Sequence, residues 1–387
     1  MLGLSALHAD EPSLAAFAFE RCLAINPQHE LCRLGILHAH VQLNETHSAR
    51  TEIRQLRQSA RTSEVQATIA HYLDLLSQAE TDSLTPQLSS YIQVGVGYDT
   101  NINSATDLSE IALPGLDDAT YLLPKEHQRQ KSGFATARYH VRYVRPLDQK
   151  WSLTAQGTIS ARGNFDTGRY NHLVSTLQLG IDRSVNQHQF STKIQLQNYR
   201  LRNRNFRNSG SILTQYAYSF NNTTELSVFG QATKINYSGN RYAPNNSRRN
   251  AKRFVGGLTL LKGLANERAV GYLTAYGGTH QKTKHMGPKN QNHRLAGVRI
   301  GGTYLVTPRF MIQAGVGIER RHFRHEHSSF GTRRKDTFYD VNLGAAYAIN
   351  RKLSLRPQYQ YYTNRSNIPL SRYKRHIFML NLRYDLL

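Results

Sequence analysis

The sequence predicts an α-helical, tetratricopeptide-like N-terminal segment followed by a 14-stranded antiparallel transmembrane β-barrel. Three observations predict this architecture. Apolar residues recur at helical spacing as far as residue 78, side chains alternate between apolar and polar from residue 89 onward, and short connections alternate with longer ones along that second part. We therefore divide the chain into residues 1–82 and residues 89–387, with a boundary in TDSLTPQ at residues 81–87.

The charge balance changes at the same boundary. Residues 1–88 carry 6 Lys and Arg against 10 Asp and Glu, whereas the remaining residues carry 43 against 16. These basic residues are scattered through predicted strands and loops without a helix-turn-helix, zinc or RNA-binding signature, so nucleic acid is not an expected partner. The sequence also lacks an 18-residue apolar run, and it therefore predicts no transmembrane helix.

The N-terminal segment has the spacing of a helical repeat. Four helices are expected, at residues 13–26, 30–43, 46–57 and 64–78. Four residues fit the second helix of a tetratricopeptide repeat: Ala15, Phe19, Cys22 and Pro27. Ala49 and Ile53 follow the first two of these by 34 residues. Because a small residue lets two helices approach closely and Pro ends a helix, we interpret the segment as a repeat array; a generic bundle of helical hairpins is the alternative.

The first residues fit the interior of such a repeat. Leu2 and Gly3 precede Ala15 by 13 and 12 residues, which is the position of a Leu-Gly pair on the first helix of the repeat. The start MLGLSALHADEPS has neither the basic region nor the long apolar core of a secretory signal. We therefore expect the helical segment to be truncated at its N-terminus, with any export signal upstream.

The two cysteines, Cys22 and Cys32, both lie in this segment. They would pair in an oxidising compartment, or remain two ordinary buried helix cysteines. The sequence alone leaves both possibilities open.

Fourteen segments with a period of two make up the rest of the chain. They lie at residues 89–98, 131–145, 150–163, 169–184, 188–201, 209–221, 223–237, 250–262, 268–283, 293–306, 309–322, 336–349, 352–364 and 373–387. Most contain 10 to 16 residues, which is enough to cross a bilayer at a tilt. Because lipid supplies no hydrogen-bond partners, spanning strands must close into a barrel.

The connections favour an outer-membrane barrel over a soluble β-sandwich or lipocalin-like barrel. Short turns such as TP at residues 307–308 and NR at residues 350–351 alternate with long loops such as residues 99–130. Outer-membrane barrels have short periplasmic turns, long external loops and an even number of strands. This parity places both ends of the barrel, and the helical segment, on the periplasmic side.

The first predicted strand runs into GYDTNIN at residues 97–103. This motif, placed after helical repeats and at the start of a 14-stranded barrel, resembles the surface lipoprotein assembly modifier (Slam) family and related translocators of soluble haem-binding proteins. The resemblance implies an outer-membrane translocator that helps a cognate client protein to reach the surface or the medium. It also implies that the repeats engage the client or a periplasmic chaperone, and it brings no cofactor and no catalytic residues.

The motif supplies the first set of candidate site residues: Gly97, Tyr98, Asp99, Asn101 and Asn103. Asp and Asn side chains commonly hold a loop through hydrogen bonds to nearby backbone groups. We expect this structural role for the three polar residues, and direct client contact is the alternative.

A second candidate set is basic and gathers at the expected outer ends of strands and in outer loops. It comprises Arg248, Arg249, Lys252, Arg253, Arg320, Arg321, Arg333, Arg334, Arg372 and Lys374. Guanidinium groups match phosphate oxygens, so part of this set is expected to contact lipopolysaccharide. Others would line the lumen and attract acidic client segments. The carboxylates expected in the lumen, among them Glu319, Asp340 and Asp385, should pair with lumen Arg side chains.

A histidine-rich stretch raises the question of a metal or haem site. His322, His325 and His327 lie close together beside Glu326, and imidazole is a common ligand. Because 17 His are spread along the chain, we favour a solvated loop here and expect no metal or cofactor. The sequence contains no GxSxG, HExxH or phosphate loop, so we do not expect an enzyme.

The expected partners are an exported client protein, outer-membrane lipid with its lipopolysaccharide, and a periplasmic chaperone, around a monomeric barrel. Two alternative functions remain. Export of an exopolysaccharide is also carried out by proteins that join repeats to a barrel. An anion-preferring porin is less favoured, since a passive pore has no need of helical repeats.

Overall fold

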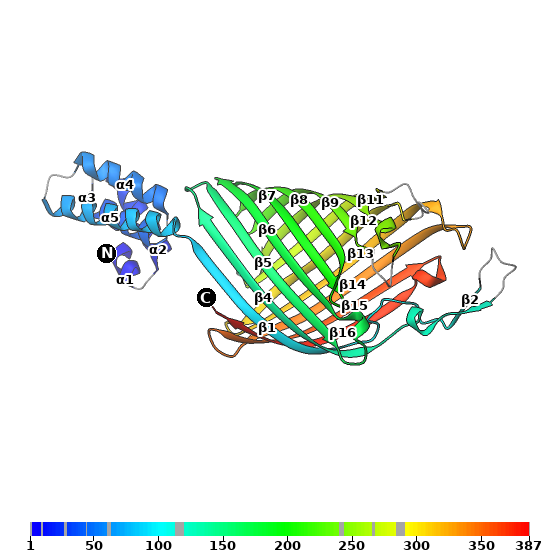
Figure 1. Cartoon of the computed structure of the whole chain (residues 1–387). Helices are drawn as coiled ribbons and strands as arrows, with labels where there is room; N and C mark the ends of the chain where they lie inside the picture. Colours follow the sequence, from blue (N-terminus) through cyan, green and yellow to red (C-terminus); the bar gives the residue numbers. More distant parts are fainter. Residues whose placement is uncertain are drawn as a thin grey trace. The chain divides into compact units, whose positions relative to one another are not determined.

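The computed structural model describes residues 2–8, 11–26, 29–43, 45–59, 63–112, 120–239, 244–264, 268–283 and 291–386. The chain divides into a helical unit, Met1–Thr85, and a barrel unit, Pro86–Leu387. This division falls inside the predicted linker at residues 81–87. Figure 1 shows the helices of the first unit and the strands of the second.

In the described residues of the helical unit there are five helices: α1 (Leu2–His8), α2 (Pro12–Ile25), α3 (Glu30–Gln42), α4 (Thr46–Ser59) and α5 (Ser63–Ser83). All four predicted helices are present, and α5 continues five residues past its predicted end at residue 78. Among the described residues, none of the helices has the length and apolar character needed to span a membrane.

The helices pack through small residues. Ala15 and Ala49 are fully buried, and Phe19 and Ile53 are buried beside them in two separate apolar clusters. The ring of Phe19 lies against Gly3, where an added Cβ would approach the ring to 2.7 Å. Close helix packing at the predicted positions is therefore present. The tetratricopeptide assignment itself stays a prediction, and Pro27 lies outside the described residues.

A disulfide joins α2 to α3. Cys22 and Cys32 are bonded, so the structure contains the first of the two alternatives that the sequence left open. The bond closes a short loop of sequence separation 10 between neighbouring helices. Such a link removes conformational freedom from the unfolded chain and thereby stabilises the folded unit.

The barrel unit contains a closed antiparallel barrel of fourteen strands, which confirms the predicted barrel. Its strands are β1 (Gln87–Asp99), β4 (Ser132–Pro146), β5 (Trp151–Asn164), β6 (His172–Val185), β7 (His188–Leu201), β8 (Arg204–Asn221), β9 (Thr224–Tyr237), β10 (Ala251–Leu264), β11 (Ala269–Lys282), β12 (His293–Thr307), β13 (Phe310–Glu326), β14 (Arg333–Ala348), β15 (Leu353–Ser366) and β16 (Tyr373–Asp385). Each strand pairs with its neighbours in this order, and β1 pairs with β16 to close the barrel.

The loop after β1 has structure that the alternation pattern did not predict. It contains a separate two-stranded hairpin of β2 (Glu110–Ala112) and β3 (Thr120–Leu122), and Figure 1 shows β2 beyond the barrel strands. A single turn of 3-10 helix, η1 (Lys125–His127), follows. Three further such turns, η2 (Gly168–Tyr170), η3 (Asn246–Arg249) and η4 (Pro369–Ser371), occupy other connections at the same end of the barrel.

One predicted loop is wrong. Residues 202–208 were expected to connect two strands, but β8 already begins at Arg204. Arg202 and Asn203 both adopt positive φ, at 50° and 59°, so they form a two-residue turn of the kind that joins tightly paired strands. The alternation of apolar and polar residues did not predict this hairpin, because a basic, Asn-rich stretch is typical of a loop.

The register separates an apolar outer face from a polar lumen. On β1, Ile92, Val94 and Val96 point outward and expose 44–58% of their surface, while Gln93 and Gly95 point into the lumen. Large apolar side chains face outward in the same way on every neighbouring strand, and a folded protein leaves such a band uncovered only where lipid surrounds it.

Aromatic side chains mark one edge of this band. We call the end with the turns between β4 and β5, β8 and β9, and β14 and β15 the short-turn end, and the opposite end the long-loop end. Outward aromatic residues near the short-turn end include Tyr143, Trp151, Phe190, Tyr216, Tyr304, Tyr347 and Tyr384. Such girdles lie at the interface between hydrocarbon and lipid headgroups.

Loss of the disulfide should loosen the helical unit selectively. We expect the double substitution Cys22→Ser and Cys32→Ser to lower the stability of this unit by about 2–3 kcal/mol, because the unfolded chain regains its loop entropy. Limited proteolysis of the full-length protein measures the change as faster cleavage between residues 1 and 85. Wild-type protein treated with a reductant should behave like the double variant. Equal cleavage rates with and without reductant would contradict the role given to the bond.

Candidate functional site: the lumen wall and the seam

The predicted motif lies where the barrel closes. Strands β1 and β16 pair from Tyr91 opposite Asp385 to Asp99 opposite Ile377. Gly97 faces the lumen within this seam, and a Cβ on it would meet the ring of Phe134 at 2.6 Å as well as the carbonyl oxygen of Phe378. Glycine is therefore required here so that a fully buried lumen aromatic can pack against β1.

Asp99 forms the centre of an ion-pair cluster that we call the Asp99 clasp. The carboxylate is fully buried and accepts hydrogen bonds from Nη2 of Arg375 at 2.6 Å and from Nη2 of Arg162 at 2.9 Å. The backbone N–H of Asn101 donates a third, at 3.0 Å. Because Arg162 belongs to β5 and Arg375 to β16, the clasp connects the two sides of the seam with a further strand.

The guanidinium group of Arg162 is held on its other side by an aromatic ring. Its Cζ lies 3.6 Å from the ring centroid of Phe134, which is a cation–π contact. The same Phe134 ring covers Gly97, so the glycine, the ring and the guanidinium stack in order at the seam. A buried carboxylate with two well-placed arginines avoids the penalty that an unpaired buried charge would carry.

Asn101 and Asn103 make the side-chain-to-backbone hydrogen bonds that the sequence predicted. The amide nitrogen of Asn101 donates to the carbonyl oxygens of Ala105 and Lys374, and its Oδ1 accepts from the N–H of Ala105. Asn103 donates to the carbonyl oxygen of Gln128 at 2.7 Å. Both residues therefore shape the start of the loop after β1.

Tyr98, the remaining motif residue, does not join this network. It points outward and exposes 42% of its surface in the lipid-facing band. The motif thus divides by parity into a lumen part and a lipid-facing part. The signal for this division is present in the sequence, since residue 98 shares its parity with Ile92, Val94 and Val96.

The lumen carboxylates pair with arginine, as expected. Glu319 is buried and accepts hydrogen bonds from Nε of Arg321 at 2.6 Å and from the hydroxyl of Tyr276 at 2.9 Å. Asp340 accepts from Arg299 at 3.2 Å. The third predicted carboxylate, Asp385, accepts from Nε of Arg383 at 2.8 Å, and Asp336 accepts in the same way from Arg334.

The lumen wall is left with an excess of positive charge. Register places these basic residues inward: Arg138, Arg142, Arg162, Lys193, Arg207, Arg253, Arg299, Arg321, Arg334, Arg356, Arg375 and Arg383. Fewer acidic residues share this face: Asp99, Asp182, Glu225, Glu319, Asp336, Asp340 and Asp385. A lumen with this balance attracts anions.

The register also divides the predicted basic set into three groups. Lys252, Arg320 and Lys374 point outward near the long-loop end, and their contact with lipopolysaccharide stays a prediction. The second group faces the lumen beside Glu319 or Asp336 and cannot contact outer-leaflet lipid: Arg253, Arg321 and Arg334. The third lies at or beyond the strand ends: Arg248 and Arg249 in η3, Arg333 at the start of β14, and Arg372 after η4.

The histidine-rich stretch is split between different environments. His322 points outward on β13, whereas His327 lies in the turn after this strand, where its Nδ1 accepts the N–H of Ser329 at 3.3 Å. Burial, and to a smaller extent the charge of Arg334, lower the pKa of His327. Within the described part of the chain, three metal-ligating atoms come together only at Cys22, His29 and Cys32, and there the two sulfur atoms form the disulfide.

The family comparison agrees with the barrel. A profile of the outer membrane protein beta-barrel domain matches residues 209–385. This match covers the part of the barrel from β8 to β16. Together with the closed fold and the exposed apolar band, it supports a location in the outer membrane. A comparison with curated proteins finds no match.

The comparison with solved structures finds matches of low sequence identity. In-vitro folded OmpT, an outer membrane protein of Vibrio cholerae, is 10% identical, with 78% of this chain and 97% of that chain covered and a TM-score of 0.42. A Pseudomonas aeruginosa FadL homologue is 12% identical, with 77% and 91% covered and a TM-score of 0.43. The outer membrane channel DcaP of Acinetobacter baumannii is 9% identical, with 78% and 97% covered and a TM-score of 0.44.

Removal of the carboxylate at the centre of the clasp should weaken the seam. We expect Asp99→Ala to destabilise the barrel by about 3–5 kcal/mol, because the side chains of Arg162 and Arg375, which are 11% and 21% exposed, lose their fully buried anionic partner. The shift is measured as a lower temperature for the loss of the compact, detergent-resistant form on a gel.

Asp385→Ala is the matched control for this variant. It also removes a seam carboxylate that binds one arginine, but the Asp385 side chain is 35% exposed, so the loss should be smaller. Equal shifts for the two variants would contradict a special role for the clasp.

Proposed function

We propose that this protein is an outer-membrane translocator that assists the export or surface display of a cognate client protein, either a surface lipoprotein or a secreted haem-binding-type protein. The observation that carries the proposal is the covalent union of a packed, disulfide-linked helical unit with a closed outer-membrane barrel. A passive pore has no need of such a unit, whereas helical arrays often bind peptides or proteins.

The helical unit is proposed to lie in the periplasm and to bind the client or its chaperone. The chain passes from α5 into β1 at the short-turn end, which in outer-membrane barrels faces the periplasm. Leu14, Phe17 and Leu31 expose large apolar side chains on α2 and α3, and they offer sites for apolar segments of a client. Client binding would shield these side chains from water.

The lumen is proposed to attract acidic segments of the client. Arginines of the wall bind the lumen carboxylates Asp99, Glu319 and Asp340, so the excess of guanidinium and ammonium groups sets the sign of the potential. The side chain of Arg299 is 49% exposed although it contacts Asp340, and it therefore remains accessible to an anion in the lumen. Electrostatic attraction of this kind raises the rate of encounter more than the final affinity.

The anion-preferring porin is retained as a second candidate, because the basic lumen favours it directly. Exopolysaccharide export is favoured less. Two lumen tyrosines that would be available for stacking on sugar rings, Tyr272 and Tyr276, pack closely over Gly301 and Gly297 of the wall. Their rings are thus committed to neighbouring strands.

Charge reversal in the lumen should reduce export. We expect Arg299→Glu combined with Arg138→Glu to lower the amount of client at the surface by about tenfold, since the lumen would then repel acidic segments. The assay co-expresses the full chain with a candidate client encoded by an adjacent gene and scores the surface exposure of that client by protease shaving. Lys252→Glu, which changes an outward charge of the same wall, should leave export within about twofold. Equal losses for lumen and outward variants would contradict the lumen role.

Conductance in planar bilayers separates the translocator from the porin. For a translocator we expect the full chain to give small or intermittent currents that favour anions, because a translocation path must stay closed between clients. A large, steady anion current from the full chain would contradict the proposed function and support the porin. In either case Arg299→Glu should shift the reversal potential toward cations, as a selectivity set by wall charge requires.

A further inference from the structure

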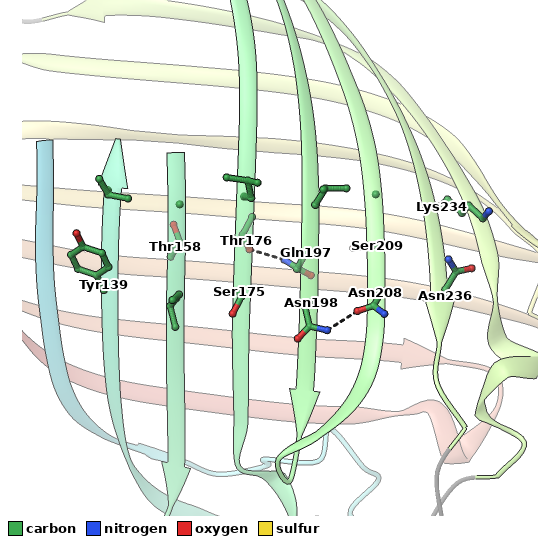
Figure 2. A pocket seen from close by; sticks show the side chains of 16 residues that line it. Tyr139, Thr158, Ser175, Thr176, Gln197, Asn198, Asn208, Ser209, Lys234 and Asn236 are labelled. Atoms are coloured by element: carbon green, nitrogen blue, oxygen red, sulfur yellow. Dashed lines mark hydrogen bonds between the residues drawn. The ribbon is translucent and has the colours of Figure 1, made fainter. Parts of the chain in front are cut away.

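The outer face of the barrel is interrupted by a polar row on β6 to β9. Ser175, Asn198, Asn208 and Asn236 are successive cross-strand neighbours, and all of them point away from the lumen. Figure 2 shows these four side chains in one row across adjacent strands, near the end where β7 turns into β8. Polar side chains on a lipid-facing surface are unfavourable unless they meet polar partners, so the row needs an explanation.

The amides of the row are only partly satisfied by one another. Asn198 donates to Oδ1 of Asn208 at 2.6 Å and to Oδ1 of Asn205 at 2.9 Å. Asn205 in turn donates to the hydroxyl of Ser238. The side-chain amide of Asn236 has no hydrogen bond to the residues that the structure describes, and this residue is exposed. The row therefore retains donors and acceptors for a further molecule.

A hollow of about 700 Å³ lies in the outer surface directly beside this row. Gly157, Ser175 and Gly210 create it, because they carry little or no side chain where their neighbours carry large ones. Its outward apolar walls come from Ile159, Leu177 and Leu196, together with Tyr139 and Val141. We call this feature the outward hollow. It has an apolar interior toward the middle of the membrane and an amide edge toward the long-loop end.

Two lysines stand at one side of the outward hollow. Lys234 lines it, and Lys252 is its direct cross-strand partner on β10. Both side chains are outward and exposed, and in the described part of the chain neither ammonium group has a hydrogen-bond or ion-pair partner. Like charges directly opposite each other on a sheet repel, and an anion bound beside them would remove this cost.

We propose that the outward hollow binds a phosphorylated glycolipid of the outer leaflet. An acyl chain fills the apolar hollow, the row of amides accepts and donates hydrogen bonds with the sugar, and the phosphate lies beside Lys234 and Lys252. The apolar hollow, the amide row and the two lysines thus lie at the membrane depths where a glycolipid has its acyl chain, its sugar and its phosphate. The inference rests on the proposed orientation, in which the long-loop end faces outward.

The same observations argue against a second copy of this chain as the occupant. An interface between copies would place the two lysines of one barrel in lipid or against another basic barrel, because the chain carries a net charge of +23. An anionic lipid compensates this charge, whereas a second copy adds to it. The connection between β7 and β8 is only the two-residue turn of Arg202 and Asn203, so this connection places no long loop above the amides of β7 and β8.

The test titrates delipidated full-length protein in detergent with purified bisphosphorylated lipid A and reads binding by native mass spectrometry. Two variants remove different parts of the site. Lys234→Ser removes the lysine that lines the hollow and leaves Lys252 in place. Gly210→Leu fills the hollow without touching a polar group, since a Cβ at Gly210 meets only Leu196 at 3.6 Å. We expect each variant to bind lipid A about tenfold more weakly than the wild type.

Matched controls come from the same face of the barrel. Lys262→Ser removes an outward lysine near the short-turn end, and Gly230→Leu adds a side chain at an outward glycine with open space around it. Both controls should bind lipid A within about twofold of the wild type, because neither residue lines the hollow.

Three results would overturn the proposal. These are equal lipid A binding by all variants, equal affinity for phosphatidylglycerol and lipid A, and a concentration-dependent dimer that Gly210→Leu abolishes. The export assay separates this proposal from the proposed function. Normal export by a variant that has lost lipid A binding leaves the function standing, and normal lipid A binding by a protein that exports no client leaves the glycolipid site standing.

Discussion

Closure of β1 on β16 is the contact on which the barrel depends. In hydrocarbon every backbone peptide group of a strand must form a hydrogen bond with a neighbouring strand. At the seam these neighbours, β1 and β16, come from opposite ends of the barrel sequence. The chain adds two devices there. Glycines on β1 let Asn381 and Phe134 pack against its backbone, and the Asp99 clasp draws β5 and β16 to the end of the first strand. Side-chain contacts near the end of β1 thus stabilise the pairing of β1 with β16, the two strands that lie farthest apart in the sequence.

The same alternation that builds the wall also distributes charge. One parity carries apolar and aromatic groups into lipid, and the other carries the arginines and carboxylates of the lumen. Because each strand offers only every second residue to the lumen, neighbouring basic residues such as Arg320 and Arg321 act on opposite sides of the wall. A cluster of basic residues that looks uniform in the sequence therefore has members on both faces of the wall, and these members have different surroundings.

The sequence predicted most of the barrel because a period of two is a direct physical consequence of strand geometry. Strand number, the exposed face of Ile92 and Val94, and the loop-holding bonds of Asn101 and Asn103 all follow from local pattern. The partners of Asp99 did not follow, since Arg162 and Arg375 reach it only through the register of distant strands. The outward hollow was missed for a related reason: its row combines residues from β6 to β9, and no single strand shows it.

Whether the bond between Cys22 and Cys32 is formed depends on the compartment in which the chain lies. Thiols stay reduced in the cytosol and become oxidised outside it. Before oxidation, α2 and α3 lack their covalent link and the helical unit is easier to unfold. At the proposed periplasmic location the thiols become oxidised, and the bond then fixes α2 against α3.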